Sequence, residues 1–164
     1  QSDAGALDIQ LAPMDLSDCL ASRLADADRW LVDSGLTLTE QIEPGIMIRG
    51  DAQRLRQLWN NLLDNSCAYT QPPGELRVTL TTQQGMAVVT WEDSTPGVPE
   101  GELARLTERL YRVEGSRNRA SGGSGLGLSI ASALVNAHGA TLTPSTSTLG
   151  GLRWTLRFPL LTPV

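Results

Sequence analysis

The sequence of 164 residues contains no lysine, and all thirteen of its basic residues are arginines. The absence of lysine excludes a P-loop, a phosphate-binding lysine of the protein-kinase type and any other chemistry that requires this side chain. The formal net charge of −5 argues against a nucleic acid as the main partner, so we expect no nucleic-acid binding.

Cysteine is scarce, and long apolar stretches are missing. Cys19 and Cys67 fit no metal-binding spacing and no disulfide framework, and both fall in helical patterns, which favours a reducing, cytoplasmic setting. No run of 18 or more residues is apolar, so we expect no membrane-spanning segment and no direct membrane contact. Residues 1–11 lack the apolar region of a signal peptide. The length suits a single domain over residues 1–164.

Hydrophobic periodicity and turn residues predict the order of the elements. Helices are expected over residues 15–33, 51–70, 100–110 and 125–138. Strands are expected over residues 7–11, 36–40 and 46–48, with hairpins over 76–92 and 141–158 and a loop over 113–124. This order predicts an α/β two-layer sandwich in which a mixed, mostly antiparallel sheet packs against helices.

The predicted helix over residues 51–70 has an apolar arc and a polar arc. Asn61 and Asn65 lie four residues apart on the polar arc, so their side chains lie one above the other. An amide oxygen can complete a Mg²⁺ shell that phosphate and water oxygens mostly fill, and Tyr69 lies one turn further on. The alternative is an ordinary solvated helix face.

A glycine-rich run over residues 122–128 precedes the last predicted helix. Its alternating glycines, Gly123, Gly125 and Gly127, let the backbone approach an anion closely, and the helix start offers unpaired N–H groups. No strand precedes the run, so it is not a dinucleotide fingerprint. Arg112 and Arg117 could pair with phosphate oxygens. The alternative is a flexible, solvated loop.

Asp93 ends a predicted strand, and a turn that contains Gly97 and Val98 follows. An ionised aspartate only accepts hydrogen bonds, so it can bind the amino group of adenine and would repel the carbonyl oxygen of guanine. The alternative is common turn chemistry.

In this order, the motifs resemble the catalytic ATP-binding domain of sensor histidine kinases. This domain has the Bergerat-type nucleotide fold that gyrase, Hsp90 and MutL share, with an ATP lid loop on the helical side. The matching residues are Arg54, Leu55, Gln57, Leu58, Asn61, Leu62, Leu63, Asn65, Tyr69, Thr70, Asp93, Gly97, Glu108, Arg109, Tyr111, Arg112 and Gly123 to Leu128. Residues 114–125 look nearest an envelope-stress sensor subgroup of that family.

The resemblance implies a role for each site residue. Asn65 would hold Mg²⁺ with Asn61 beside it, Asp93 would bind adenine, and Tyr69 would pack near the base or the sugar. Arg112, Arg117 and the glycine-rich lid would bind the phosphates of ATP. The full set of further nucleotide-binding residues is Gly97, Val98, Arg112, Arg117, Gly123, Gly125, Leu126, Gly127 and Leu128. Gyrase-type ATPases activate water with a glutamate where this chain has Asn61, so we expect ATP to be kept from hydrolysis and its γ-phosphate to be transferred.

The resemblance also implies partners. The phosphate acceptor would be a histidine on an upstream dimerisation domain, of which residues 1–6 are the tail, and the phosphate would pass to a response regulator receiver domain. His138 ends a predicted helix, where we expect it to contact the last carbonyls or solvent. The chain would be the cytoplasmic domain of an inner-membrane sensor.

Four residues depart from the family pattern: Ala68, Thr95, Leu110 and Leu152. Because of them, two alternatives stay open beside the kinase. One is a Bergerat-fold ATPase or an anti-sigma serine kinase. The other is a degenerate, non-catalytic module that regulates by docking.

Overall fold

The computed structural model describes residues 8–94 and 125–162. The predicted helix over 100–110 and the predicted loop over 113–124 lie outside these residues. The helices are α1 (Leu16–Asp26), α2 (Asp28–Asp33), α3 (Ala52–Tyr69) and α5 (Gly125–Ala137). The strands are β1 (Ala12–Asp15), β2 (Leu36–Ile42), β3 (Met47–Gly50), β4 (Gly74–Gln83), β5 (Met86–Asp93), β6 (Thr141–Thr146) and β7 (Leu152–Pro159).

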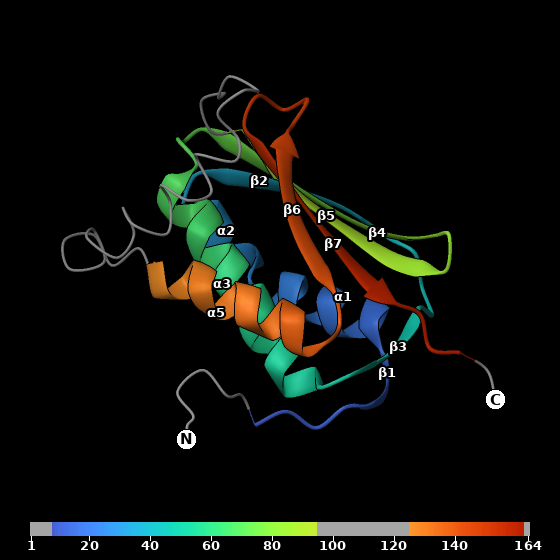
Figure 1. Cartoon of the computed structure of the whole chain (residues 1–164). Coiled ribbons are helices and arrows are strands. Elements are labelled where there is room, and N and C mark those ends of the chain that lie inside the picture. Colours follow the sequence, from blue (N-terminus) through green and yellow to red (C-terminus); the bar gives the residue numbers. More distant parts are fainter. Residues whose placement is uncertain (1–7, 95–124, 163–164) are drawn as a thin grey trace.

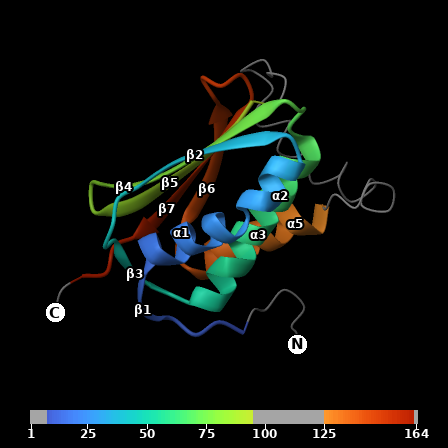
Figure 2. The same ribbon diagram turned by 180° about the vertical axis from the view of Figure 1, so that it is seen from behind.

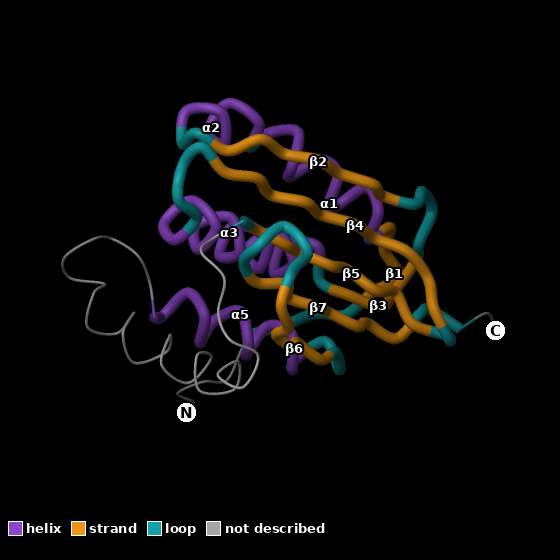
Figure 3. Tube along the Cα trace, turned by 90° about the horizontal axis from the view of Figure 1, so that it is seen from above, coloured by secondary structure: helices purple, strands orange, loops and turns teal. Residues whose placement is uncertain are grey.

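Five of these strands form one sheet in the order β2-β4-β5-β7-β6. Only β2 and β4 are parallel; the other neighbours are antiparallel. The four described helices lie on one side of this sheet, as the two opposite views in Figures 1 and 2 show. Figure 3 shows α5 beneath β6 and β7 at one end of the layer, and α2 near β2 at the other. The predicted two-layer sandwich with a mixed, mostly antiparallel sheet is therefore confirmed.

The core lies between the helices and the sheet, with α3 at its centre. Strand residues on the helix side are buried, because side chains alternate between the two faces of a strand. The ring of Trp91 on β5 stacks on Trp59 of α3 with centroids 6.4 Å apart and planes 6° apart, and Phe158 of β7 meets Trp59 edge-on. All residues of the predicted apolar arc of α3 are buried: Leu55, Leu58, Trp59, Leu62, Leu63 and Ser66.

The strand predicted near the amino terminus is wrong. The strand expected over residues 7–11 is absent from the described part of that range, and Leu11 is 38% exposed. Instead, β1 pairs with β3 from Ala12 onward and includes Pro13. A proline is tolerated there because β1 pairs only with β3 and so is an edge strand.

The helix expected over 15–33 is interrupted at Ala27, which ends α1 and precedes α2. Its inner side nevertheless runs through both helices, since Leu20, Leu24, Ala27 and Leu31 are fully buried.

The first turn of α3 is capped by Asp51. Its carboxylate accepts the backbone N–H groups of Gln53 and Arg54 at 3.1 and 3.2 Å, and that of Gln10 at 3.0 Å. The backbone N–H of Asp51 donates to Nε2 of His138 at 3.1 Å. Because Nε2 accepts, Nδ1 carries the hydrogen and donates to the carbonyl of Leu134 at 2.8 Å. His138 thus contacts a carbonyl in the last turn of α5, as expected, but it is buried and not solvated.

None of the described helices combines the length and the apolar content needed to cross a bilayer. Cys19 and Cys67 are both free thiols, as predicted.

We expect Asp51 to make the stability of the fold depend on pH. Backbone hydrogen bonds, that of Gln10 above all, lower the pKa of the Asp51 carboxyl below its ordinary value. Its contribution is therefore present above about pH 4, the usual aspartate pKa, and is lost as the pH falls through the lower folded-state pKa. Asp51→Asn keeps a capping oxygen but removes this charge. Denaturant unfolding from pH 7 to pH 2 should show a stability difference from the wild type that shrinks toward acid pH. A constant difference would contradict this.

The hydrogen bond between Trp91 and Ser66 should matter for stability. Trp91 Nε1–H donates to Ser66 Oγ at 2.9 Å inside the core. Ser66→Ala would leave this donor buried without an acceptor, at a cost of about 1–3 kcal/mol. Urea unfolding of Ser66→Ala, Trp91→Phe and the double variant would measure the coupling between them. The two effects should be clearly less than additive, and strict additivity would show that the bond contributes nothing.

Candidate nucleotide-binding site

The structure brings Asn65 and Asp93 to the same end of the interface between α3 and the sheet. Asn65 directly precedes Ser66 on α3, and Asp93 lies two residues after Trp91 on β5. The 2.9 Å bond between Trp91 and Ser66 therefore ties the backbone beside one candidate residue to the backbone beside the other. Asn65 and Asp93, 28 positions apart in the sequence (93 − 65), thus each lie next to or two residues from one end of the same hydrogen bond.

The asparagine pair lies on the flank of α3 outside its apolar stripe. Asn61 and Asn65 are both half-buried, whereas Leu62 and Leu63 between them are buried in the core. The side-chain nitrogen of Asn61 is inaccessible to solvent and has no hydrogen-bond partner among the described residues. A buried donor without an acceptor costs about 1–3 kcal/mol. A phosphate oxygen is the kind of acceptor that this donor lacks.

Helix α5 runs antiparallel to α3 and lies beside it (Figure 1). Its carboxyl end is fixed at the start of α3 by the bond between His138 and Asp51. Thirteen residues of α5 span about 20 Å, which is also about the distance along α3 from Asp51 to Asp64. The first backbone N–H groups of α5 are therefore near the level of Asn65 along α3. A helix amino terminus carries a partial positive charge that favours anions.

The predicted phosphate-binding residues lie partly inside and partly outside the described residues. Gly125, Leu126, Gly127 and Leu128 form the first turn of α5, and the structure describes their backbone. The others lie outside the described residues: Gly97, Val98, Arg112, Arg117 and Gly123. Tyr69 is described; it is half-buried and is the last residue of α3.

Asp93 is the last residue of β5 and is 8% exposed. Its Oδ1 accepts the backbone N–H of Leu152 at 3.2 Å. Leu152 is one of the departures from the family pattern, and here its backbone rather than its side chain contacts the aspartate. The carboxylate is thus buried at the end of the sheet and held by the first residue of β7.

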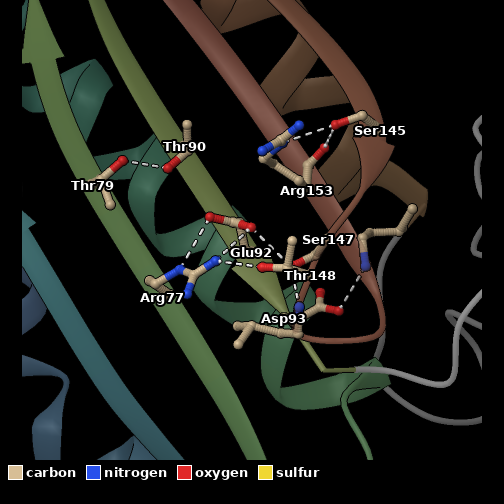
Figure 4. A network of polar contacts seen from close by, with 11 residues as sticks. Arg77, Thr79, Thr90, Glu92, Asp93, Ser145, Ser147, Thr148 and Arg153 are labelled. Carbon is tan, nitrogen blue, oxygen red and sulfur yellow. Dashed lines mark hydrogen bonds and ion pairs between the residues drawn. The ribbon is translucent and has the colours of Figure 1, made fainter.

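The residue before Asp93 belongs to a polar network that Figure 4 shows from close by. Glu92 is 4% exposed and receives two bonds of 3.2 Å from the guanidinium of Arg77. Ser147 Oγ–H donates to Glu92 Oε1 at 2.8 Å, and Arg77 also donates to Thr148 at 3.0 Å. The network links β4 and β5 to the turn between β6 and β7.

Sequence reasoning missed this network. The available signal was Glu92, a charged residue at an outward position of the mostly apolar strand β5. An arginine, Arg77, lies on the preceding strand, β4. The register pairs Arg77 with Glu92 directly, and opposite charges at paired positions stabilise a sheet. That register could not be read from the sequence without the turn geometry.

The described residues offer binding groups but no reactive nucleophile. Burial raises the pKa of the Cys19 and Cys67 thiols above its ordinary value, so neither is poised to react at neutral pH. No cluster of three or more His, Cys, Asp or Glu side chains that could hold a metal occurs in residues 8–94 and 125–162. A cation here would depend on neutral amide oxygens and on oxygens of its ligand, which suits a metal that arrives with phosphates.

Comparison with known proteins gives the family. Residues 50–162 match the histidine kinase-, DNA gyrase B- and HSP90-like ATPase family. The signal transduction histidine-protein kinase BaeS of Escherichia coli K12 is 43% identical over 159 residues, which are 97% of this chain and 34% of BaeS. The probable sensor histidine kinase TcrY of Mycobacterium tuberculosis is 36% identical over 93% of this chain and 32% of TcrY. The chain thus spans about a third of the length of these curated relatives.

Solved structures share the fold. The mycobacterial sensor histidine kinase MprB superposes with a TM-score of 0.73 at 25% identity, covering 94% of this chain and 100% of that one. The catalytic domain of histidine kinase ThkA gives a TM-score of 0.75 at 18% identity over 92% of this chain and 95% of its own. The resemblance drawn from the motifs is therefore confirmed. With its Bergerat fold and the family match over residues 50–162, the chain belongs to the histidine kinase-, DNA gyrase B- and HSP90-like ATPase family.

Proposed function

We propose that this chain is the catalytic domain of a sensor histidine kinase, which binds Mg-ATP and donates the γ-phosphate to a histidine on an upstream dimerisation domain. The observation that carries the proposal is the bond between Trp91 and Ser66, which holds Asp93 and Asn65 at one end of the fold. This bond supports a site in which one nucleotide meets both an acceptor for its adenine amino group and an amide for its phosphate-bound cation.

In this proposal, Asp93 accepts the amino group of adenine, and Asn65 contributes an amide oxygen to Mg²⁺. The unpartnered amide nitrogen of Asn61 then donates to a phosphate oxygen. When bound, Mg²⁺ would neutralise charge on the phosphates. The backbone N–H groups at the start of α5, with Gly123, Arg112 and Arg117, hold the phosphate chain, while Tyr69, Gly97 and Val98 border the nucleotide.

The phosphate acceptor in this proposal lies outside the chain. His138, the one histidine, is buried and uses both ring nitrogens, one toward Asp51 and one toward Leu134. It has no nitrogen available to attack a phosphate. Because the curated relatives are about three times as long, their additional length can contain the acceptor domain. A response regulator receiver domain would then take the phosphate, and the chain would be the cytoplasmic part of a membrane sensor.

The first test is nucleotide binding. Asn65→Ala and Asp93→Ala should each weaken binding of a non-hydrolysable ATP analogue about 10- to 100-fold, as expected when a bond to a charged partner is lost. The effect of Asn65→Ala should disappear without Mg²⁺, whereas that of Asp93→Ala should persist. Isothermal titration calorimetry measures both.

Thr90→Val is the matched control for this test. It removes a contact between Thr79 and Thr90 on the open face of the sheet and should leave nucleotide affinity unchanged. Absence of binding by the wild type at millimolar nucleotide would favour the non-catalytic docking module.

ATP hydrolysis separates the kinase from the ATPase of the same family. Asn61 has no oxygen basic enough to activate water, so the chain alone should release almost no phosphate from Mg-ATP. Asn61→Glu supplies a carboxylate at that position, and general-base catalysis typically contributes about 10²–10⁴-fold, so phosphate release should rise at least about tenfold. A coupled phosphate assay, with Asn61→Gln as the control, measures this. Steady hydrolysis by the wild type would favour the ATPase.

A further inference from the structure

We propose that Glu92 and Ser147 are positioning residues for adenine recognition. They hold the turn between β6 and β7 so that the backbone N–H of Leu152 fixes the orientation of the Asp93 carboxylate. The inference rests on the proposed role of Asp93 as the acceptor for the adenine amino group, and it assigns a function to the open face of the sheet, which none of the described helices covers.

The two consecutive acidic residues point to opposite faces of β5, because side chains alternate along a strand. Asp93 has the same parity as the core residue Trp91 and faces the helices, whereas Glu92 faces the open side. A carboxylate on an open face is normally solvated, yet the side chain of Glu92 is only 6% exposed. Arg77 and the β6–β7 turn enclose it, and its oxygens accept three hydrogen bonds (Figure 4).

The hydroxyl of Ser147 links this carboxylate to the turn. It donates to Glu92 Oε1 at 2.8 Å and accepts the backbone N–H of Leu149 at 3.0 Å. The Ser147 backbone closes the turn, since its N–H donates to Gly151 at 2.9 Å and its carbonyl accepts from Gly150 at 3.0 Å.

The residue that follows this turn contacts Asp93. Leu152 follows Gly151 directly and donates its N–H to Asp93 Oδ1 at 3.2 Å. The carboxylates of Glu92 and Asp93 therefore bind the two ends of one turn, from opposite faces of the sheet. The position of the Leu152 N–H group therefore depends on the turn as well as on the pairing of Leu152 with Thr146 of β6, and with it the bond that Asp93 accepts depends on the turn.

This bond matters because the terminal torsion of an aspartate is broad and poorly restrained by itself. A backbone donor whose own position is fixed restricts the rotation of the carboxylate before the base arrives. A carboxylate offers about four lone-pair positions, so it can accept from Leu152 and from an adenine amino group together. Pre-organisation of this kind strengthens binding by lowering the entropy lost on association.

The test is the preference for ATP over purine riboside triphosphate, which lacks the 6-amino group. The ratio of the two dissociation constants isolates recognition of that group from general effects on the fold. The wild type should prefer ATP about tenfold or more, as expected for a bond to a charged acceptor. Ser147→Ala should reduce the ratio to about threefold or less, because the turn loses its link to Glu92.

Matched variants make the test specific. Ser147→Thr keeps the hydroxyl and should retain the wild-type ratio. Thr90→Val removes a contact on the same face, two residues before Glu92; it should lower stability in urea without changing the ratio. Should Ser147→Ala fail to fold, Glu92→Gln, which keeps the volume but not the charge, should also lower the ratio.

The outcomes are distinguishable. A ratio in Ser147→Ala equal to that of the wild type overturns the positioning role, as does an equal loss of affinity for both nucleotides. A wild type that binds both nucleotides equally overturns the role of Asp93 in base recognition, while one that binds neither overturns the proposed function itself.

Discussion

Trp91 extends from β5 to α3 and makes two contacts with that helix. Its ring stacks on Trp59, and its Nε1–H donates to Ser66, seven residues and so about two turns further along α3. Two contacts at separate points fix both the rotation of α3 about its axis and its translation along β5. A stack alone would leave the helix able to slide. The positions of Asn61 and Asn65 relative to the end of β5 follow from this pair of contacts.

The second helix of the site is positioned from its far end. His138 closes α5 and accepts the N–H of Asp51, so the last turn of α5 and the first turn of α3 are joined. This joint lies at the opposite end of α5 from the proposed phosphate contacts. Asp51 thereby serves both helices, because its side chain caps α3 while its backbone binds His138.

Buried polar groups on the two faces of the sheet differ in how they are satisfied. On the open face, Glu92 accepts bonds from Arg77 and Ser147. Burial of this charge is tolerable because it is paired. On the helix side, the amide nitrogen of Asn61 has no partner among the described residues. An unsatisfied donor is retained at a cost in stability, which is typical of a site that a ligand completes.

The sequence alone determined the layers, the buried arc of α3, both hairpins and the family, because these depend on local periodicity, turn residues and ordered motifs. It failed for β1, where pairing with β3 outweighed the alternation over residues 7–11 and included Pro13. The motifs identified Asn65 and Asp93 as candidate site residues. Only the tertiary structure showed that Trp91 and Ser66, which lie beside them in the sequence, are hydrogen-bonded to each other. It alone also revealed how Glu92 reaches Asp93 through a turn more than fifty residues away. The physical reason is that strand register and helix docking depend on contacts between distant segments, which no local pattern encodes.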